Sequence, residues 1–182
     1  MGMAAPIYYT ADMVRALPED GNRYEVVHGE LLVTPAPRLW HQELTARLVA
    51  ALRVYLDAEP VGVALSSPAD ISWGRHVMAQ PDVFVVPLEE ARPQDWSRIR
   101  HLLLAAEVLS PSSTRADRFT KRRLYQERGV GDYWVVDGDA RVVEVWRPQA
   151  ESPTMERERL TWQPSGARAP VSLALEDLFR PI

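Results

Sequence analysis

One segment constrains the fold more than any other. The run LLLAAEVL at residues 102–109 is nearly all apolar and contains a single charged side chain, Glu107. An apolar run of this length predicts a central strand buried on both faces. An ionised carboxylate without a partner is costly in such a strand. We therefore expect a partner for Glu107 near the C-terminal end of the strand.

Strand and helix patterns alternate on both sides of this run. Apolar spacing and end signals predict helices at 10–17, 39–57 and 114–128. Period-two patterns and turn residues predict strands at 23–27, 30–34, 61–66, 69–73, 82–86, 102–109, 133–137, 142–146 and 157–162. The alternation indicates an α/β fold. With 182 residues, 46% of them hydrophobic, we expect one domain over residues 1–182.

The composition limits the kinds of metal site and the cellular location that we expect. The chain has no cysteine, which excludes disulfides and thiolate metal sites, so any metal site is expected to be rich in oxygen ligands. The first ten residues lack the pattern of a secretory signal, and no apolar run reaches the length needed to cross a bilayer. We therefore expect a cytoplasmic protein without a membrane segment.

Two carboxylates are candidates for chemistry. Asp82 begins the apolar run DVFVV, and Glu107 ends another apolar strand. Two carboxylates that act with substrate phosphate oxygens commonly hold Mg²⁺. Arginine partners are the structural alternative, and the residues alone favour neither.

The helix that follows Glu107 carries further candidates. Asp117, Lys121 and Tyr125 are spaced at i, i+4 and i+8 and therefore share one face. Lys121 is the only lysine in the chain. From this helix it can reach the carboxylate site and stabilise charge on a phosphate. The alternative is an ordinary surface ion pair between Asp117 and Lys121.

The same helix is also basic, although the chain has a net charge of −4. Arg115, Arg118, Arg122 and Arg123 are the candidate nucleic-acid-binding residues. A phosphate-facing surface and a solvated helix face explain these arginines equally well.

An ordered set of motifs resembles a known family. The segments YEVVHGELLVTPAP, His41, QPDV, EVLSPSS, the D-x-x-x-K-x-x-x-Y helix and GVGDYWVVD occur in this order. Together they are similar to the Uma family of restriction-endonuclease-like proteins, within the PD-(D/E)XK nuclease superfamily. The resemblance implies a core of helix, three strands, helix and strand around a mixed sheet flanked by helices, to which N- and C-terminal β-hairpins are added here.

The resemblance also implies a nuclease site dependent on Mg²⁺ or Mn²⁺. Asp82 matches the PD motif and Glu107 the (D/E) position. The superfamily usually has lysine two residues after that acid, where this chain has Leu109, and Lys121 matches a lysine relocated to the next helix. Glu25 matches the family's N-terminal glutamate, which implies a place near the metal; stabilisation of the hairpin explains it at least as well.

Supporting roles are expected for Glu25, Asp117, Tyr125 and His41, although helix-end packing or capping explains His41 better than catalysis. The leading hypothesis is a metal-dependent endonuclease acting on nucleic acid, with DNA as the expected substrate and a homodimer suggested by the resemblance. The alternative is a non-catalytic nucleic-acid or protein interaction module that keeps the nuclease fold. An acid/base hydrolase without metal would leave Lys121 and the basic helix unexplained.

Overall fold

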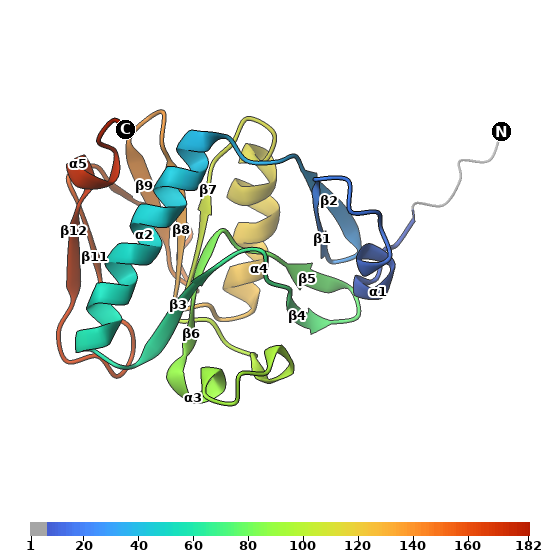
Figure 1. The fold of residues 1–182 in the computed structure, drawn as a ribbon, viewed down its shortest axis with the longest axis horizontal. Helices are drawn as coiled ribbons and strands as arrows, with labels where there is room; N and C mark the ends of the chain where they lie inside the picture. The colour runs from blue at the N-terminus through green and yellow to red at the C-terminus, as the bar shows by residue number, and fades with distance from the viewer. Residues whose placement is uncertain (1–6) are drawn as a thin grey trace.

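A mixed six-stranded sheet forms the centre of the computed structural model, which describes residues 7–182 (Figure 1). Its strands, in spatial order, are β10 (Thr154–Glu156), β9 (Val142–Trp146), β8 (Asp132–Asp137), β7 (Leu104–Val108), β6 (Val83–Pro87) and β3 (Gly62–Ser66). The pair β7–β8 is parallel, and the other neighbouring pairs are antiparallel. The parallel pair requires a crossover connection, which here is helical.

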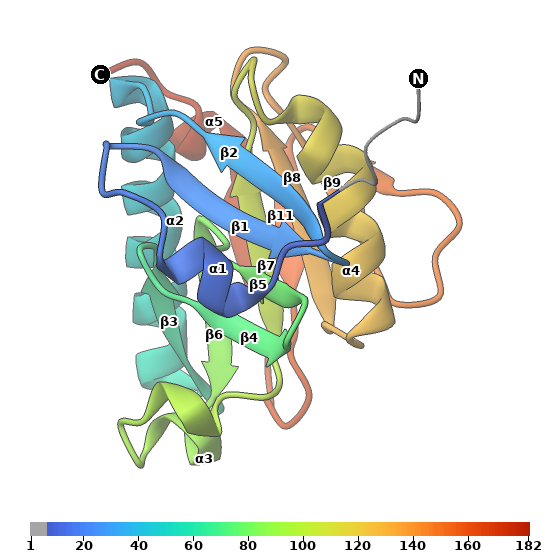
Figure 2. The same ribbon diagram turned by 90° about the vertical axis from the view of Figure 1, so that its right-hand side faces the viewer.

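Helices cover both faces of this sheet (Figure 2). On one face lies α2 (Leu39–Ala58), whose Leu44, Leu48 and Leu52 recur at helical spacing and are completely buried against the sheet. On the other lies the crossover, a π-helical turn (Ala116–Lys121) that continues into α4 (Arg122–Glu127). The crossover thereby brings its buried side chains over β7 and β8.

The remaining strands form two smaller sheets. One has the order β2 (Glu30–Thr34), β1 (Arg23–Val27), β5 (Val77–Ala79) and β4 (Ile71–Gly74). The other pairs β11 (Arg159–Trp162) with β12 (Val171–Ala174). Short helical elements complete the chain: α1 (Ala11–Arg15), α3 (Leu88–Ala91), the 3₁₀ turn at Trp96–Arg98 and α5 (Leu175–Leu178).

The β1–β2 hairpin turns through His28 and Gly29, which both have positive φ, at 51° and 81°. Positive φ at both central residues is the geometry of a type I′ turn, whose twist matches that of the flanking strands. The hairpin was expected from the HG dipeptide, and its strands have the expected bounds. The antiparallel pairing of β1 with β5, through Val26 and Met78, joins the hairpin to the rest of this smaller sheet.

The fold class expected from the sequence is confirmed. The helix α2, the strands β3, β6 and β7, the crossover helix and β8 form the nuclease-like core, and hairpins flank it at both ends. Three strands were not anticipated: β5, β10 and β12. The first two have three residues each and β12 has four, too few to display a period.

The π-helical turn was also not anticipated. The backbone N–H of Arg122 donates to the carbonyl of Asp117, five residues earlier, and the Tyr133 hydroxyl donates to the same carbonyl at 2.9 Å. A side chain that enters a helix's hydrogen-bond ladder distorts it locally. Such π turns are frequent at functional sites.

Within residues 7–182, no helix combines the length and the apolar character needed to cross a membrane.

Candidate active site

The register of β6 and β7 sets Asp82 beside Glu107. Val83 pairs with Ala106, and the same antiparallel register continued by one residue joins Asp82 to Glu107. Side chains alternate along a strand, and Phe84, two residues after Asp82, packs on the sheet face that the crossover helix covers. The two carboxylates therefore point to the same face of the sheet, as a shared metal site requires.

Asp82 is held by three donors. Its Oδ1 accepts a hydrogen bond from Arg23 Nη1, and its Oδ2 accepts one from the backbone N–H of Val108 at 2.8 Å and lies 3.0 Å from His41 Nε2. Burial opposes ionisation, but the His41 hydrogen bond and the Arg23 charge outweigh it and hold the pKa of Asp82 below its usual value. Asp82 is therefore an ionised, oriented carboxylate.

Glu107 lies deeper, in a network centred on Lys121. The Lys121 Nζ atom lies 2.7 Å from Glu25 Oε2, 3.2 Å from Glu107 Oε1 and 3.5 Å from Asp117 Oδ1. The Tyr125 hydroxyl donates to Glu107 Oε1 at 2.9 Å. All five side chains are essentially inaccessible to solvent. Thus the structure brings Lys121 and Tyr125 to Glu107, and the surface ion pair that was the alternative for Lys121 is wrong.

Negative charge is in excess in this network. Four buried carboxylates, those of Glu25, Asp82, Glu107 and Asp117, face the two full cations of Arg23 and Lys121.

This excess shows in the proton affinities. Burial raises the pKa of Glu107 well above its usual value, Lys121 opposes the shift, and the neighbouring carboxylates add to it. Burial likewise raises the pKa of Asp117. With all four acids ionised, the cluster lacks two positive charges.

The donor set fits a hard divalent cation. Among the described residues, Glu25 Oε2, Glu107 Oε2 and Asp117 Oδ1 are buried carboxylate oxygens without a hydrogen-bond partner. Glu25 Oε2 and Asp117 Oδ1 lie 2.7 Å and 3.5 Å from Lys121 Nζ, which leaves Glu107 Oε2 as the oxygen of the three without an ion pair.

Mg²⁺ uses one or two protein carboxylates together with water and substrate phosphate oxygens. No three His, Cys, Asp or Glu side chains in residues 7–182 are gathered as a complete ligand set. Asp82 and Glu107 lie on the same sheet face and could hold such an ion once Arg23 leaves Asp82 Oδ1.

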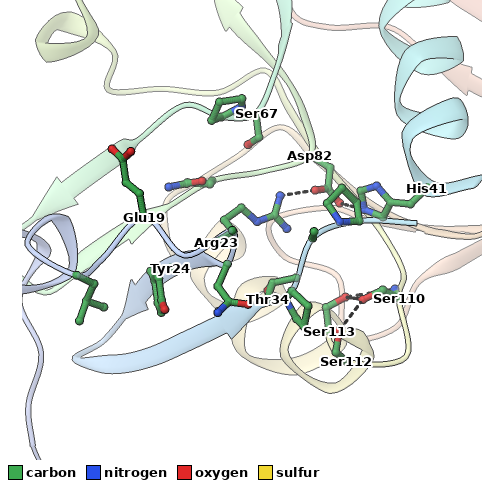
Figure 3. Close-up of a pocket in the computed structure, with 18 of the residues that line it drawn as sticks. Glu19, Arg23, Tyr24, Thr34, His41, Ser67, Asp82, Ser110, Ser112 and Ser113 are labelled. Carbon is green, nitrogen blue, oxygen red and sulfur yellow. Dashed lines mark hydrogen bonds and ion pairs between the residues drawn. The ribbon is translucent and has the colours of Figure 1, made fainter. Parts of the chain in front are cut away.

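A cleft of about 740 Å³ opens over Asp82. Figure 3 shows Arg23 and His41 converging on Asp82 from opposite sides, with the serines of the 110–113 turn nearby. Among the described residues, Glu107 and Lys121 do not line the cleft. The buried network is therefore reached from solvent through Asp82 and Arg23.

The four candidate nucleic-acid-binding arginines lie elsewhere. Arg118 pairs with Glu144 at 2.7 Å and Asp137 at 3.1 Å. Arg122 lies over the Trp146 ring, 4.7 Å from its centroid. Arg115 and Arg123 are exposed. None of the four arginines is among the described residues that line the cleft.

Two site residues were missed or misjudged from the sequence. Arg23 was not a candidate, although it precedes Glu25 by two residues in a strand and so lies on the same side of it. For His41 a supporting role was considered and helix-end packing or capping was preferred; its Nε2 lies 3.0 Å from Asp82 Oδ2. No spacing along the chain links His41 to Asp82, because they meet only through the fold.

Comparison with known proteins agrees with this architecture. Residues 11–180 match the profile of Uma2, a family described as "Putative restriction endonuclease". The chain belongs to the Uma2 family. A crystal structure described as "a putative nuclease belonging to DUF820", from Anabaena variabilis, is similar with a TM-score of 0.75 and 25% identity, covering 93% of this chain and 97% of that one.

The search of curated proteins found no match. The Uma2 membership and the solved nuclease fold together support a nuclease-like function.

Proposed function

We propose that this Uma2 protein is a metal-dependent endonuclease that cleaves phosphodiester bonds in nucleic acid, with DNA as the expected substrate. In this proposal Asp82 and Glu107 hold Mg²⁺ or Mn²⁺. The observation that carries it is the cluster of four buried carboxylates around two cations, in which Glu107 Oε2 has no partner in the described part of the chain. With all four acids ionised, the cluster lacks two positive charges. A divalent cation would supply the missing charge.

The protein's own residues would prepare this site. His41 and the Val108 N–H orient Asp82, while Tyr125 and Lys121 orient Glu107. Bound metal would supply water activation and polarisation of the scissile phosphate. Arg23 holds Asp82 Oδ1, so it would have to leave that oxygen and could then contact a substrate phosphate.

Lys121 would act through the carboxylates, because it is buried and does not itself line the cleft. Because it is 1% exposed and contacts Glu107, its ammonium can assist the water or offset charge that develops at the phosphate through this shared site. Glu25 and Asp117 would keep that ammonium charged and in place, since their charges and that of Glu107 hold the pKa of Lys121 above its usual value against the effect of burial.

One observation favours the second candidate, a binding module without turnover. Both oxygens of Asp82 already have protein partners, so the fold is electrostatically supported at this point without a metal. Such a module would bind nucleic acid or protein and would leave phosphodiester bonds intact in any metal.

The deciding experiment is a cleavage assay on single-stranded and duplex DNA and RNA with Mg²⁺, Mn²⁺ or EDTA. We expect cutting with metal, none with EDTA, and loss of cutting in Asp82→Asn and Glu107→Gln. Glu19→Gln is the matched control, since Glu19 is an exposed acid that lines the same cleft. Folded protein that cuts nothing in either metal while still binding nucleic acid would support the binding module instead.

A further inference from the structure

A second hollow, of about 1060 Å³, adjoins the cleft over Asp82. Arg15, Pro68 and Asp70 line both hollows, so the two share a rim. An ion pair of 3.4 Å joins Arg15 to Asp70 at this junction. In Figure 1, β4 lies above the segment that follows α3, and residues of both line the hollow.

Two tryptophans line this second hollow, which we call the tryptophan groove: Trp73 from β4 and Trp96 from the 3₁₀ turn. Trp96 is 51% exposed, an unusual exposure for so large an apolar side chain. Its ring packs on Phe84, at 6.3 Å between centroids. One part of the indole is therefore anchored on the core while much of it stays open to solvent.

Trp73 is also anchored. Its Nε1 donates to the carbonyl of Arg100 at 2.8 Å, and its ring meets the edge of Tyr125 with centroids 6.3 Å apart. Tyr125 in turn donates to Glu107. Phe84, beneath Trp96, follows Asp82 by two residues in sequence. Each tryptophan thus packs directly on an aromatic ring that is tied to the candidate active site.

The rim of the tryptophan groove is basic. Arg15, Arg100 and Arg128 line it, and Asp70 is the acidic residue among its described lining residues. Arg15 pairs with Asp70, whereas neither Arg100 nor Arg128 forms an ion pair with a described carboxylate. An anchored aromatic face beside guanidinium groups that are not held in ion pairs is the arrangement that binds single-stranded nucleic acid, where bases stack and phosphates pair with cations.

We propose that the tryptophan groove binds an unpaired stretch of the nucleic acid whose phosphodiester enters the adjoining cleft, with a base stacked on Trp96. A duplex keeps its bases stacked on each other, so it cannot offer one to Trp96 without unpairing. The substrate class is therefore nucleic acid with a single-stranded segment. This inference rests on the proposed nuclease function for the class of ligand, but the groove's binding is measurable without cleavage.

The test is fluorescence anisotropy with labelled DNA and RNA oligonucleotides, each single-stranded and as a duplex, in EDTA so that nothing is cut. We expect tighter binding of single strands than of duplexes. Trp96→Ala should weaken single-strand binding about fivefold to a hundredfold, the range produced by loss of one base–aromatic stack. Duplex binding should hardly change. The DNA and RNA arms show which strand the groove accepts.

Three further variants separate stacking from folding and from general charge. Trp96→Leu keeps apolar cover over Phe84 without a stacking face and should behave as Trp96→Ala, whereas Trp96→Tyr should retain most binding. Phe119→Ala is the matched control, since Phe119 is 63% exposed and is not among the described groove residues. Arg128→Ala should lower the dependence of log affinity on log salt by about 0.7, as for one lost phosphate contact on a single strand.

Unchanged single-strand binding in Trp96→Leu would overturn the inference, as would an equal loss in Phe119→Ala or an equal loss on duplexes. A parent protein that binds no single strand, but forms a dimer that Trp96→Leu disrupts, would show that the groove binds a second copy instead. Cleavage of duplex substrates together with unaltered Trp96 variants would refute the groove and leave the nuclease proposal standing. Trp96-dependent binding without cleavage in any metal would support the groove and refute the nuclease proposal.

Discussion

Replacing Lys121 with methionine tests the buried network most directly. The substitution removes the ammonium that lies within 3.5 Å of the Glu25, Glu107 and Asp117 carboxylates. Methionine fills similar space but leaves these carboxylates without their shared cation. Breaking a buried ion pair by removing one partner costs about 3–5 kcal/mol. For a chain of this size that loss corresponds to a melting-temperature decrease of about 6–20 °C.

The effect on activity must be separated from this loss of stability. Below the melting temperature of the variant, Lys121→Met should cut about a hundredfold more slowly or worse, comparable to removal of one donor that stabilises a transition state. Lys121→Arg should restore only part of the activity, because the planar guanidinium is larger than an ammonium. Thermal denaturation and single-turnover cleavage, measured on the same preparations, give the two quantities.

A matched control and a double variant complete the experiment. Arg123 lies on the same helix, its side chain is 74% exposed, and it pairs with Glu127. Arg123→Met should therefore change the free energy of unfolding by no more than about 0.5 kcal/mol. Lys121→Met combined with Glu107→Gln should lose less stability than the sum of the single variants, because the two groups interact. A Lys121→Met protein as stable as the parent would refute the buried network, and one that is fully active would refute the lysine's proposed role.

Three further outcomes follow from the structure. If the basic helix binds phosphates, charge reversal of the exposed Arg115 and Arg123 should weaken nucleic-acid binding and reduce its salt dependence; unchanged affinity in a titration would mean that the helix is only solvated. Burial raises the pKa of Asp132 to about 6 from 3.8, so the free energy of unfolding should fall as pH rises between these values. Asp132→Asn should remove this pH dependence and should raise the free energy of unfolding by up to roughly 3 kcal/mol at pH 7, measured by urea denaturation. Tyr125→Phe deletes the hydroxyl that donates to the buried Glu107 and should cost about 1–3 kcal/mol by the same measurement; a neutral result would contradict that hydrogen bond.

The sequence predicted the core of this fold because its strands and helices carry strong local signals. The apolar run around Glu107 and the leucine spacing of α2 identified a buried strand and its covering helix, and both are present. Short strands such as β5 lack enough residues for a pattern, so only their pairing defines them. At the π-helical turn the Asp117 carbonyl accepts from the Tyr133 hydroxyl, which comes from a different strand and leaves no trace within the helix sequence.

Some residues of the candidate site could be predicted from the sequence, and others could not. Glu107 and Lys121 could be found because a charge inside an apolar strand and a single lysine on a helix are visible along the chain. Arg23 and His41 could not be placed in this way, because they reach Asp82 from two elements that are separated from it by 59 and 41 residues. Contacts of this kind are set by how β1 and α2 pack against the end of β6.

The position of Lys121 follows from the topology of the parallel pair. A strand–helix–strand crossover between β7 and β8 places its helix against one sheet face, and that face carries Glu107. A lysine two residues after the acid would lie on the same face, where this chain has Leu109, half-buried against the adjoining core. The ammonium can therefore come from the helix while the strand end remains apolar. In this structure the cation on the Glu107 face is supplied by the helix.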